Sequence, residues 1–259
     1  MDTLSATHLL LACVALAAGF IDAVAGGGGM LTVPSLMLAL GDPRVVLGTN
    51  KGQSVWGTAA ATLAFARAGK LDRVRAPITF VAAASGSLVG AMLVARLRPE
   101  VVRPLVVGLL VGAAAFVFAR GLSSARAEAA PAGKPFARSW PRLTVAAIAF
   151  GLGAYDGFFG PGTGTFLIVA FSWAFGDALD VATANAKVAN LASNLAALVA
   201  FAHAGRVDWR YAAPMAVAQV AGGALGARAT LRGGERLVRV GVLLVTAALT
   251  VRLVLQMVG

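Results

Sequence analysis

Long apolar stretches, separated by short polar segments, run along most of the chain. Their approximate bounds are residues 4–40, 48–66, 76–95, 104–119, 143–176, 181–202, 211–231 and 237–258. A membrane helix needs about 20 apolar residues to cross a hydrocarbon core about 30 Å thick. A transmembrane β-barrel would instead alternate apolar and polar residues over segments of about ten. The pattern therefore predicts an all-α, polytopic membrane protein that resides in a lipid bilayer.

The composition agrees with this fold class. Of the 259 residues, 59% are apolar and 13% are charged, and the mean hydropathy is +0.82. Soluble domains have about 45–50% apolar and about 25% charged residues. The net charge is +11, but the basic residues lie mostly between the apolar stretches, as in inward-facing membrane loops. No basic patch with interleaved aromatic residues occurs outside these loops, so nucleic acid is not an expected partner.

The chain divides nearly in half at a polar segment rich in basic residues, proline and glycine. The halves repeat each other: Lys51 aligns with Lys187 at an offset of 136, and Asp22 aligns with Asp156 at an offset of 134. Each repeat is expected to have about four to five transmembrane helices. The predicted parts are a first transmembrane repeat (1–119), a polar linker (120–142) and a second transmembrane repeat (143–259). In transporters with internal repeats, the substrate binds at the repeat interface.

Each repeat begins with an apolar stretch that is too long for one crossing and is interrupted by glycine. The first contains Gly26, Gly27, Gly28 and Gly29, and the second contains Gly160, Pro161, Gly162 and Gly164. Glycine inside a helix costs about 1 kcal/mol relative to alanine. We therefore expect a helix, an unwound turn and a second, shorter helix in each repeat. Irregular backbone at membrane depth persists only where it is buried in protein or lines a wet cavity.

Two topologies fit this pattern. If each half has four crossings, the repeats are parallel, and the loop Lys and Arg residues split about 11 to 8 between the two sides. If each half has an odd number of crossings, the repeats are inverted. Segments 67–75, 120–142 and 228–239 then share a side with 4, 5 and 4 basic residues, 13 in total against 6. The positive-inside rule favours the inverted arrangement, with the linker in the cytoplasm.

Two lysines lie inside apolar helices at matching positions of the repeats. A charge at the centre of a membrane helix costs about 2.5–3.5 kcal/mol on insertion scales, so a matched pair indicates function. Lys51 shares one helix face with Ser54 and Thr58, at i+3 and i+7. The equivalent face of the second repeat carries Lys187, Asn190 and Asn194. These faces predict a binding site for a small anion; the alternative is that both lysines extend to the membrane interface.

The glycine-rich turns offer a second feature for anion binding. A short helix that begins after such a turn presents free backbone N–H groups and the positive end of its dipole. The candidate donors are Gly27, Gly28, Gly29, Gly162 and Thr163, with the amide of Asn50 beside Lys51. The alternative is a helix break that only permits close packing.

Two acidic residues, Asp22 and Asp156, precede the glycine-rich turns by four residues. Three roles are open for them: they carry a coupling proton, they pair with the lysines, or they brace the turns by accepting hydrogen bonds from N–H groups. Bracing is the role that we favour from the sequence.

Motifs for catalysis or cofactor binding are not found. The two histidines, His8 and His203, lack neighbouring ligands, the single cysteine Cys13 excludes a cysteine-based metal site, and no P-loop, nucleophile elbow or zinc-protease motif occurs. We therefore expect no enzyme activity, no cofactor and no metal. Paired glycines such as Gly86 and Gly90 are expected to pack helices within the chain, with a homodimer interface as the alternative.

Paired segments in the two halves carry a resemblance to a known family. The first half contains GFIDAVAGGGGMLTVPSL followed by GTNK, and the second contains GAYDGFFGPGTGTFL followed by NAKVANLASNLAAL and FAHAGRVDW. These segments resemble the two signature regions of the TauE/SafE family, the sulfite-exporter-like membrane permeases. One departure is Met30, where the family often continues with glycine. The resemblance covers nearly the whole chain and implies proton-linked or facilitated export of sulfite, sulfoacetate or related anions across a bacterial plasma membrane.

Together these features predict a secondary membrane transporter of a small anion, either sulfite or an organosulfonate such as sulfoacetate. The protein would be a multi-pass protein of the bacterial plasma membrane. Because no ATPase motif is present, the energy would come from a gradient. The alternatives are an uncoupled anion channel and a non-transporting membrane assembly subunit, which would not need matched buried lysines.

Overall fold

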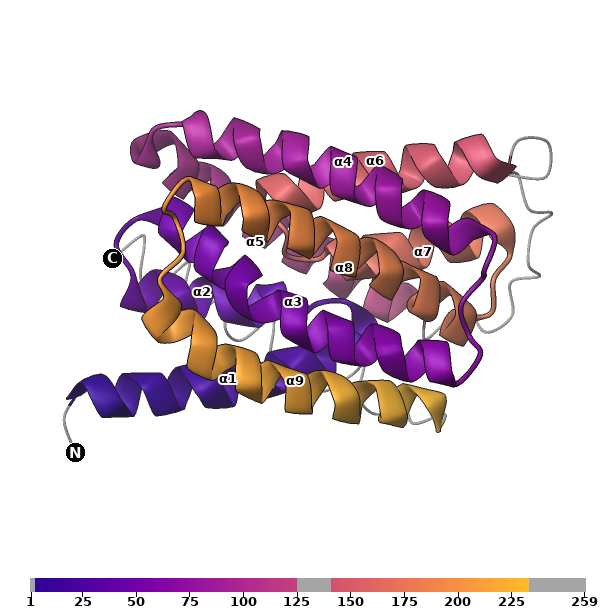
Figure 1. The fold of residues 1–259 in the computed structure, drawn as a ribbon, viewed down its shortest axis with the longest axis horizontal. Helices are drawn as coiled ribbons and strands as arrows, with labels where there is room; N and C mark the ends of the chain where they lie inside the picture. Colours follow the sequence, from indigo (N-terminus) through magenta and orange to yellow (C-terminus); the bar gives the residue numbers. More distant parts are fainter. Residues whose placement is uncertain (1–2, 125–140, 233–259) are drawn as a thin grey trace.

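The computed structural model describes residues 3–124 and 141–232, and every regular element within these ranges is an α-helix (Figure 1). The helices are α1 (Thr3–Ala25), α2 (Gly29–Ala39), α3 (Pro43–Arg67), α4 (Arg75–Arg96), α5 (Pro99–Ser124), α6 (Pro141–Phe158), α7 (Thr163–Phe175), α8 (Leu179–His203) and α9 (Trp209–Leu231). The predicted all-α class is therefore confirmed. The predicted apolar stretch 237–258 and most of the predicted linker 120–142 lie outside the described residues.

Both long apolar stretches are broken at their glycines, as the sequence predicts. The first divides into α1 and α2, and the second divides into α6 and α7. Gly26, Gly160 and Gly162 have φ values of +79°, +101° and +85°. Residues with a Cβ atom rarely adopt these values, so glycine is what allows the chain to turn there.

The central helices α3 and α8 run antiparallel. At one end of the bundle, which we call the first end, the N–H of Asp208 after α8 donates to Oγ1 of Thr49 near the start of α3 (2.9 Å). At the second end, Lys70 after α3 pairs with Asp180 in the first turn of α8 (2.7 Å). Each helix therefore ends where the other begins.

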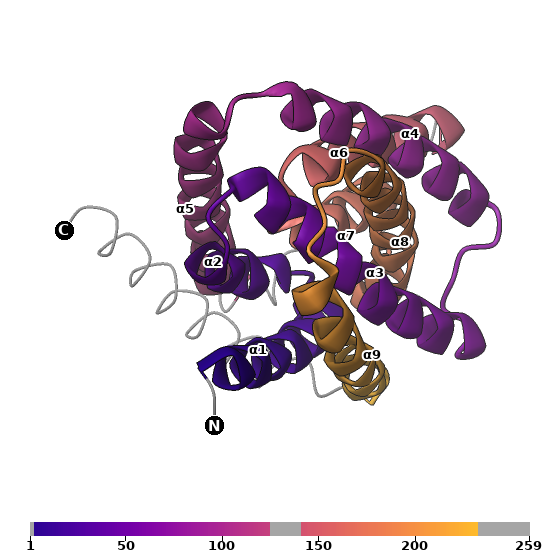
Figure 2. The same cartoon turned by 60° about the vertical axis from the view of Figure 1, so that its left-hand side comes forward.

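Two parallel helix pairs flank this centre, α1 with α9 and α4 with α6 (Figure 2). Gly86 and Gly90 of α4 lie against the backbone of α6, and Gly222 and Gly226 of α9 lie against the backbone of α1. These glycines pack helices within the chain. In contrast, an added Cβ at Gly108 or Gly112 of α5 would meet nothing within 4 Å.

Each broken helix returns to the end of the bundle from which it started. Since α1 is parallel to α9, it starts at the first end, and Gly41 after α2 lies there too, where its carbonyl accepts from Arg103 (2.9 Å). Since α6 is parallel to α4, it starts at the second end, where Asp177 after α7 pairs with Arg75 (2.8 Å). The chain therefore reverses direction at each glycine-rich break.

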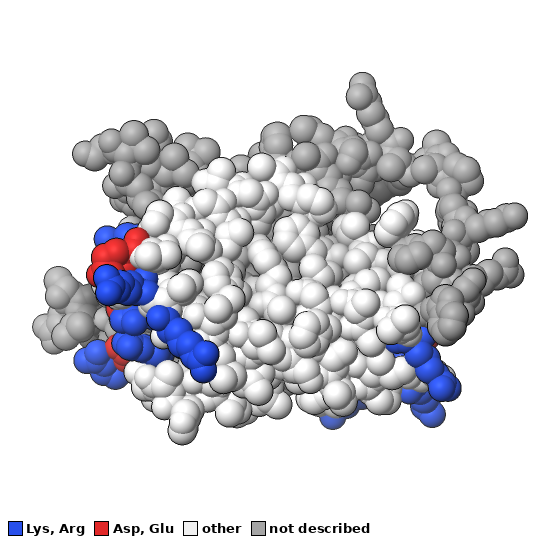
Figure 3. All heavy atoms as spheres, turned by 90° about the horizontal axis from the view of Figure 1, so that it is seen from above, with Lys and Arg blue, Asp and Glu red and all other residues white. Residues whose placement is uncertain are grey.

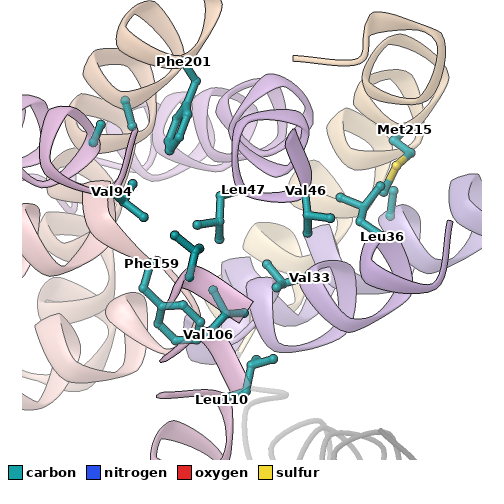
Figure 4. Close-up of a cluster of buried hydrophobic side chains, with 14 of the residues drawn as sticks. Val33, Leu36, Val46, Leu47, Val94, Val106, Leu110, Phe159, Phe201 and Met215 are labelled. Carbon is teal, nitrogen blue, oxygen red and sulfur yellow. The ribbon is translucent and has the colours of Figure 1, made fainter. Parts of the chain in front are cut away.

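Apolar clusters close the bundle on both sides of its centre. The largest lies toward the first end and includes Val46, Leu47 and Phe201 (Figure 4). Along α3, the buried polar residues between positions 49 and 58 follow this cluster and precede Ala61 and Phe65, which belong to a different apolar cluster. The polar residues of α3 at the centre thus lie between two apolar clusters.

The surface has the distribution expected of a protein within a bilayer. On the face shown in Figure 3, charged side chains gather at the two ends of the long axis, and the surface between them is uncharged. Many large apolar side chains are exposed, among them Val81 on α4 and Val217 on α9. Within the described ranges, three helices are long and apolar enough to cross a membrane: Ala6–Ala25, Arg75–Arg96 and Pro99–Phe116.

Candidate anion site between the broken helices

A small polar cavity lies where the two breaks meet α3 and α8. About 30 Å³ of it is open to the centres of water molecules, which is room for about two or three waters. Its walls are formed by Asp22, Gly26, Gly29, Asn50, Lys51, Ser54, Thr58, Asp156, Gly160, Thr163, Gly164, Asn190, Asn194 and Gln219. Both halves of the sequence contribute to it.

Lys51 enters the cavity from α3 and reaches the break of the other half. Its ammonium forms an ion pair with Asp156 (Nζ to Oδ1, 2.9 Å) and donates to Oδ1 of Asn194 (2.9 Å). An added Cβ at Gly160 would lie 3.0 Å from this ammonium, so the missing side chain gives the lysine its space. The second carboxylate oxygen of Asp156 accepts a hydrogen bond from the hydroxyl of Ser193. A buried lysine of this kind is tolerated because it is paired and hydrogen-bonded.

Lys187 enters from α8 and makes the reciprocal pair. Its ammonium lies 2.8 Å from Oδ2 of Asp22 and also donates to the backbone carbonyl of the same residue. Its side chain is completely buried and does not line the cavity. The two ion pairs thus connect each lysine to the break of the opposite half.

The two breaks touch each other directly. An added Cβ at Gly26 would come within 3.0 Å of the backbone of Gly164 and Thr165. The hydroxyl of Thr165 donates to the carbonyl of Ala25 (2.7 Å), which ties the start of α7 to the end of α1. The hydroxyl of Thr163 donates to the carbonyl of Gly160 (2.6 Å). The cavity therefore depends on a glycine junction that has no room for side chains.

The first turns of α2 and α7 lack side-chain caps. Neither Gly28 before α2 nor Gly162 before α7 provides a side-chain acceptor. Helix N-termini in this condition attract anions through their N–H groups and the helix dipole. Gly29 and Thr163, the first residues of the two short helices, both line the cavity. The N–H of Thr163 already donates to the carbonyl of Gly160 (3.1 Å), so at this helix start the dipole remains for an anion.

A hydrogen-bond network connects α2 to the α3 side of the cavity. The hydroxyl of Thr32 donates to Oδ1 of Asn50 (2.5 Å), and Nε2 of Gln53 donates to the same oxygen (3.0 Å) and to Oγ of Ser54 (2.9 Å). These bonds fix the orientation of the amide and hydroxyl groups beside Lys51.

Most of the site residues expected from the sequence meet at this cavity. Those that line it are Asp22, Gly29, Asn50, Lys51, Ser54, Thr58, Asp156, Thr163, Asn190 and Asn194. Those that do not line it are Gly27, Gly28, Gly162 and Lys187. Of the three roles open for the aspartates, the geometry places both carboxylates against lysines.

Sequence reasoning missed four residues that line the cavity: Gly26, Gly160, Gly164 and Gln219. The glycines belong to breaks that were recognised, but which glycine faces the cavity depends on how the breaks cross. Gln219 lies in α9, is buried, and its Oε1 has no hydrogen-bond partner in the described part of the chain. The sequence signal that could have identified Gln219 is an amide side chain within an otherwise apolar helix.

The cavity offers an anion one ammonium, several amides and hydroxyls, and two helix starts without side-chain caps. The carboxylates of Asp22 and Asp156 also line it, and they are paired with Lys187 and Lys51. Within the ranges that the structure describes, no three His, Cys, Asp or Glu side chains gather in a way that could hold a metal ion.

Ionised groups at the first end of the bundle are arranged differently, as partly buried caps. The carboxylate of Asp42 accepts from the N–H of Arg44 at the start of α3 (2.9 Å) and from the Arg44 guanidinium (2.8 Å). The side-chain hydrogen bond from Arg44 holds the pKa of Asp42 below its ordinary value of 3.8. These groups stabilise the start of α3, and the hydrogen bonds between Asp42 and Arg44 do not include a cavity residue.

Comparison with known proteins places the chain among membrane transporters. Residues 11–253 match the family described as Sulfite exporter TauE/SafE. The chain is 37% identical over 246 residues to the probable membrane transporter protein YfcA of Escherichia coli, covering 93% of this chain and 87% of that protein. It is 34% identical over 251 residues to the probable membrane transporter protein ORF9 of a Sinorhizobium species, covering 96% and 93%. No solved structure matches the chain. With a family match over nearly its whole length and relatives above 30% identity, the chain belongs to the TauE/SafE family of membrane transporters.

Proposed function

We propose that this protein is a secondary transporter of a small oxyanion, either sulfite or a small organosulfonate, and that the anion binds at Lys51. The observation that carries the proposal is the small polar cavity that a buried ammonium and two helix starts without side-chain caps line together. The family and the printed names of the relatives support transport rather than catalysis. The protein would reside in the bacterial plasma membrane.

Charge and size restrict the substrate. Two lysines and two aspartates at the centre balance each other, so an entering anion must replace Asp156 as the partner of Lys51. The cavity has room for about two or three waters, which suits a compact anion such as sulfite. A longer anion such as sulfoacetate requires the cavity to widen.

The helix directions support an inverted repeat. The matching helices α3 and α8 run antiparallel. The two broken helices, α1–α2 and α6–α7, start at opposite ends of the bundle. In such an architecture, two gates related by a pseudo-twofold axis open alternately to the two sides of the membrane. We place the second end, which includes the loop between α3 and α4, in the cytoplasm, because its loops carry 13 of the basic residues against 6 at the other end.

Cysteine labelling tests this orientation. In a cysteine-free Cys13→Ala protein, Gly41→Cys lies at the first end and Arg73→Cys lies at the second end. In intact cells, an impermeant thiol reagent should modify the cysteine at 41 and not the one at 73. Modification of both from outside, or of the one at 73 alone, would contradict the inverted, cytoplasmic-linker topology.

Uptake into liposomes tests the substrate. Purified protein would be assayed with sulfite, sulfoacetate, thiosulfate and sulfate, with acetate as the carboxylate control. A carrier should show saturable uptake and stimulation by unlabelled anion on the opposite side, whereas a channel should show neither. Absence of uptake for every sulfur oxyanion would refute the proposal, and an imposed pH gradient would reveal coupling to protons.

A further inference from the structure

The two lysines are held in different ways, and we infer that they have different roles. Lys51 contacts the transported anion, whereas Lys187 is a positioning residue that fixes the broken end of α1. The role of Lys51 rests on the proposed function, but the role of Lys187 depends only on the fold. This division departs from the sequence-based expectation that both lysines bind the anion.

Lys187 is held by the backbone carbonyl of Asp22 as well as by the carboxylate of the same residue. Its ammonium donates to the backbone carbonyl of Asp22, and the same carbonyl accepts from the N–H of Gly26, the left-handed glycine that follows α1 (2.9 Å). Carbonyls in the last turn of a helix carry partial negative charge and lack a full set of intrahelical partners. The ammonium therefore caps α1 at the point where the chain breaks. Its side chain is fully buried and is absent from the cavity wall.

Lys51 is held by side chains. Its partners are the carboxylate of Asp156 and the amide of Asn194, and both groups belong to the cavity wall. Side chains can rotate, whereas a helix carbonyl cannot leave its helix. When Lys51 turns to an anion, Asp156 keeps the hydrogen bond from Ser193. The Lys51 pair can therefore open without leaving a bare carboxylate.

The repeat itself differs at the residues that allow this opening. At an offset of 136, Ser193 aligns with Gly57, and Ser87, whose hydroxyl donates to the carbonyl of Ser193 (2.6 Å), aligns with Gly223. Gly57 and Gly223 instead pack backbone against backbone. The position equivalent to Ser193 thus has no hydroxyl for Asp22. Within the described residues, the carboxylate of Asp156 accepts from a second side chain besides its lysine, whereas that of Asp22 accepts from Lys187 alone. Of the two lysines, Lys51 lines the cavity.

Matched pair variants separate the two roles. Lys51→Met with Asp156→Asn and Lys187→Met with Asp22→Asn each remove one ion pair, keep the net charge and keep similar side-chain shapes. Sulfite uptake would be measured over a concentration series with both proteins in liposomes. The first variant should raise KM at least tenfold, because a charge-assisted hydrogen bond to the anion is lost. Because Asp22 lines the cavity, the second should change KM to some extent, but less than the first, and it should lower the maximal rate.

Two further measurements do not depend on the identity of the anion. Backbone hydrogen exchange should become faster at residues 24–29 in the Lys187 pair variant and should not change there in the Lys51 pair variant. In the Cys13→Ala background, a small methanethiosulfonate reagent should modify Lys51→Cys and leave Lys187→Cys unmodified.

The outcomes distinguish the two proposals. A wild-type protein that takes up no sulfur oxyanion refutes the proposed function, while exchange and labelling still decide the positions of the lysines. Normal uptake by the wild type, with a tenfold higher KM in the Lys187 pair variant and unchanged exchange at 24–29, overturns the division of roles. Labelling of Lys187→Cys in preference to Lys51→Cys overturns it as well.

Discussion

The junction between the two breaks can be tested with a single methyl group at Gly26. In the structure, Gly26 has a φ of +79°, and an added Cβ would approach the backbone of Gly164 and Thr165 to less than 3.0 Å. Alanine at this position therefore meets two penalties, a strained backbone and a collision with backbone atoms that cannot rotate away.

Their sizes follow from the geometry. A left-handed conformation costs a residue with a Cβ roughly 1–2 kcal/mol, and forcing an extra methyl group into a packed interior costs about 1–3 kcal/mol. Gly26→Ala should therefore lose about 2–5 kcal/mol of folding free energy. Gly69→Ala is the matched control, since its φ is +69° and an added Cβ there would meet nothing within 4 Å. It should lose about 1–2 kcal/mol only.

Denaturant titration of the purified proteins in detergent micelles would measure both losses, and liposome uptake would measure function. We expect Gly69→Ala to transport normally and Gly26→Ala to lose transport, because separation of α1 from α7 deforms the cavity. If the two variants lose the same free energy, the breaks do not press on each other as described. If Gly26→Ala transports at the wild-type rate, the junction does not shape the site.

Two further predictions concern charged groups. Lys51→Met alone should destabilise the protein by about 3–5 kcal/mol, because it leaves Asp156 buried without its partner. Adding Asp156→Asn should restore most of the lost stability without restoring sulfite uptake. A single Lys51→Met variant as stable as wild type would contradict this. Asp42→Ala should cost about 1 kcal/mol at neutral pH through loss of the cap. Because hydrogen bonding from Arg44 lowers the folded pKa of Asp42 below 3.8, its contribution is present above that pH and is lost as the pH falls through the folded value. Melting curves of wild type and Asp42→Ala should therefore converge in acid, and a constant difference would refute the ionised cap.

The sequence was informative where a residue conflicted with its surroundings. Four consecutive glycines in an apolar stretch conflict with a continuous helix, and the chain breaks there. Lys51 in an apolar helix conflicts with lipid, and the structure buries it in a polar cavity. Such conflicts are local, so they can be recognised without knowledge of the fold.

The sequence did not show which residues far apart in the chain would pair with each other. The ion pair of Lys51 joins residues 105 positions apart, counted from 51 to 156, and nothing in either segment specifies which aspartate meets which lysine. Pairing with the lysines was one of the three roles left open for the aspartates, although bracing was favoured; the structure places both carboxylates against lysines of the opposite half. The placement of Lys187 outside the cavity depends on where α1 ends relative to α8, which is a property of helix packing. Gln219 has Ala83 as its counterpart at an offset of 136, so the repeat comparison concealed it.

A site that supplies its own counter-ion also determines how tightly the substrate can bind. Under the proposed function, the anion would gain a charge-assisted hydrogen bond to Lys51, but Lys51 would give up its bond to Asp156 (2.9 Å). The free energy of binding would then be the difference between two similar terms. The hydrogen bond from Ser193 to Asp156 would soften the loss without cancelling it. Such a difference is small, and even a net gain of about 4 kcal/mol corresponds to a Kd of only about 1 mM. Affinity in this range lets the anion leave on the far side of the membrane, and reformation of the Lys51–Asp156 pair then favours its release.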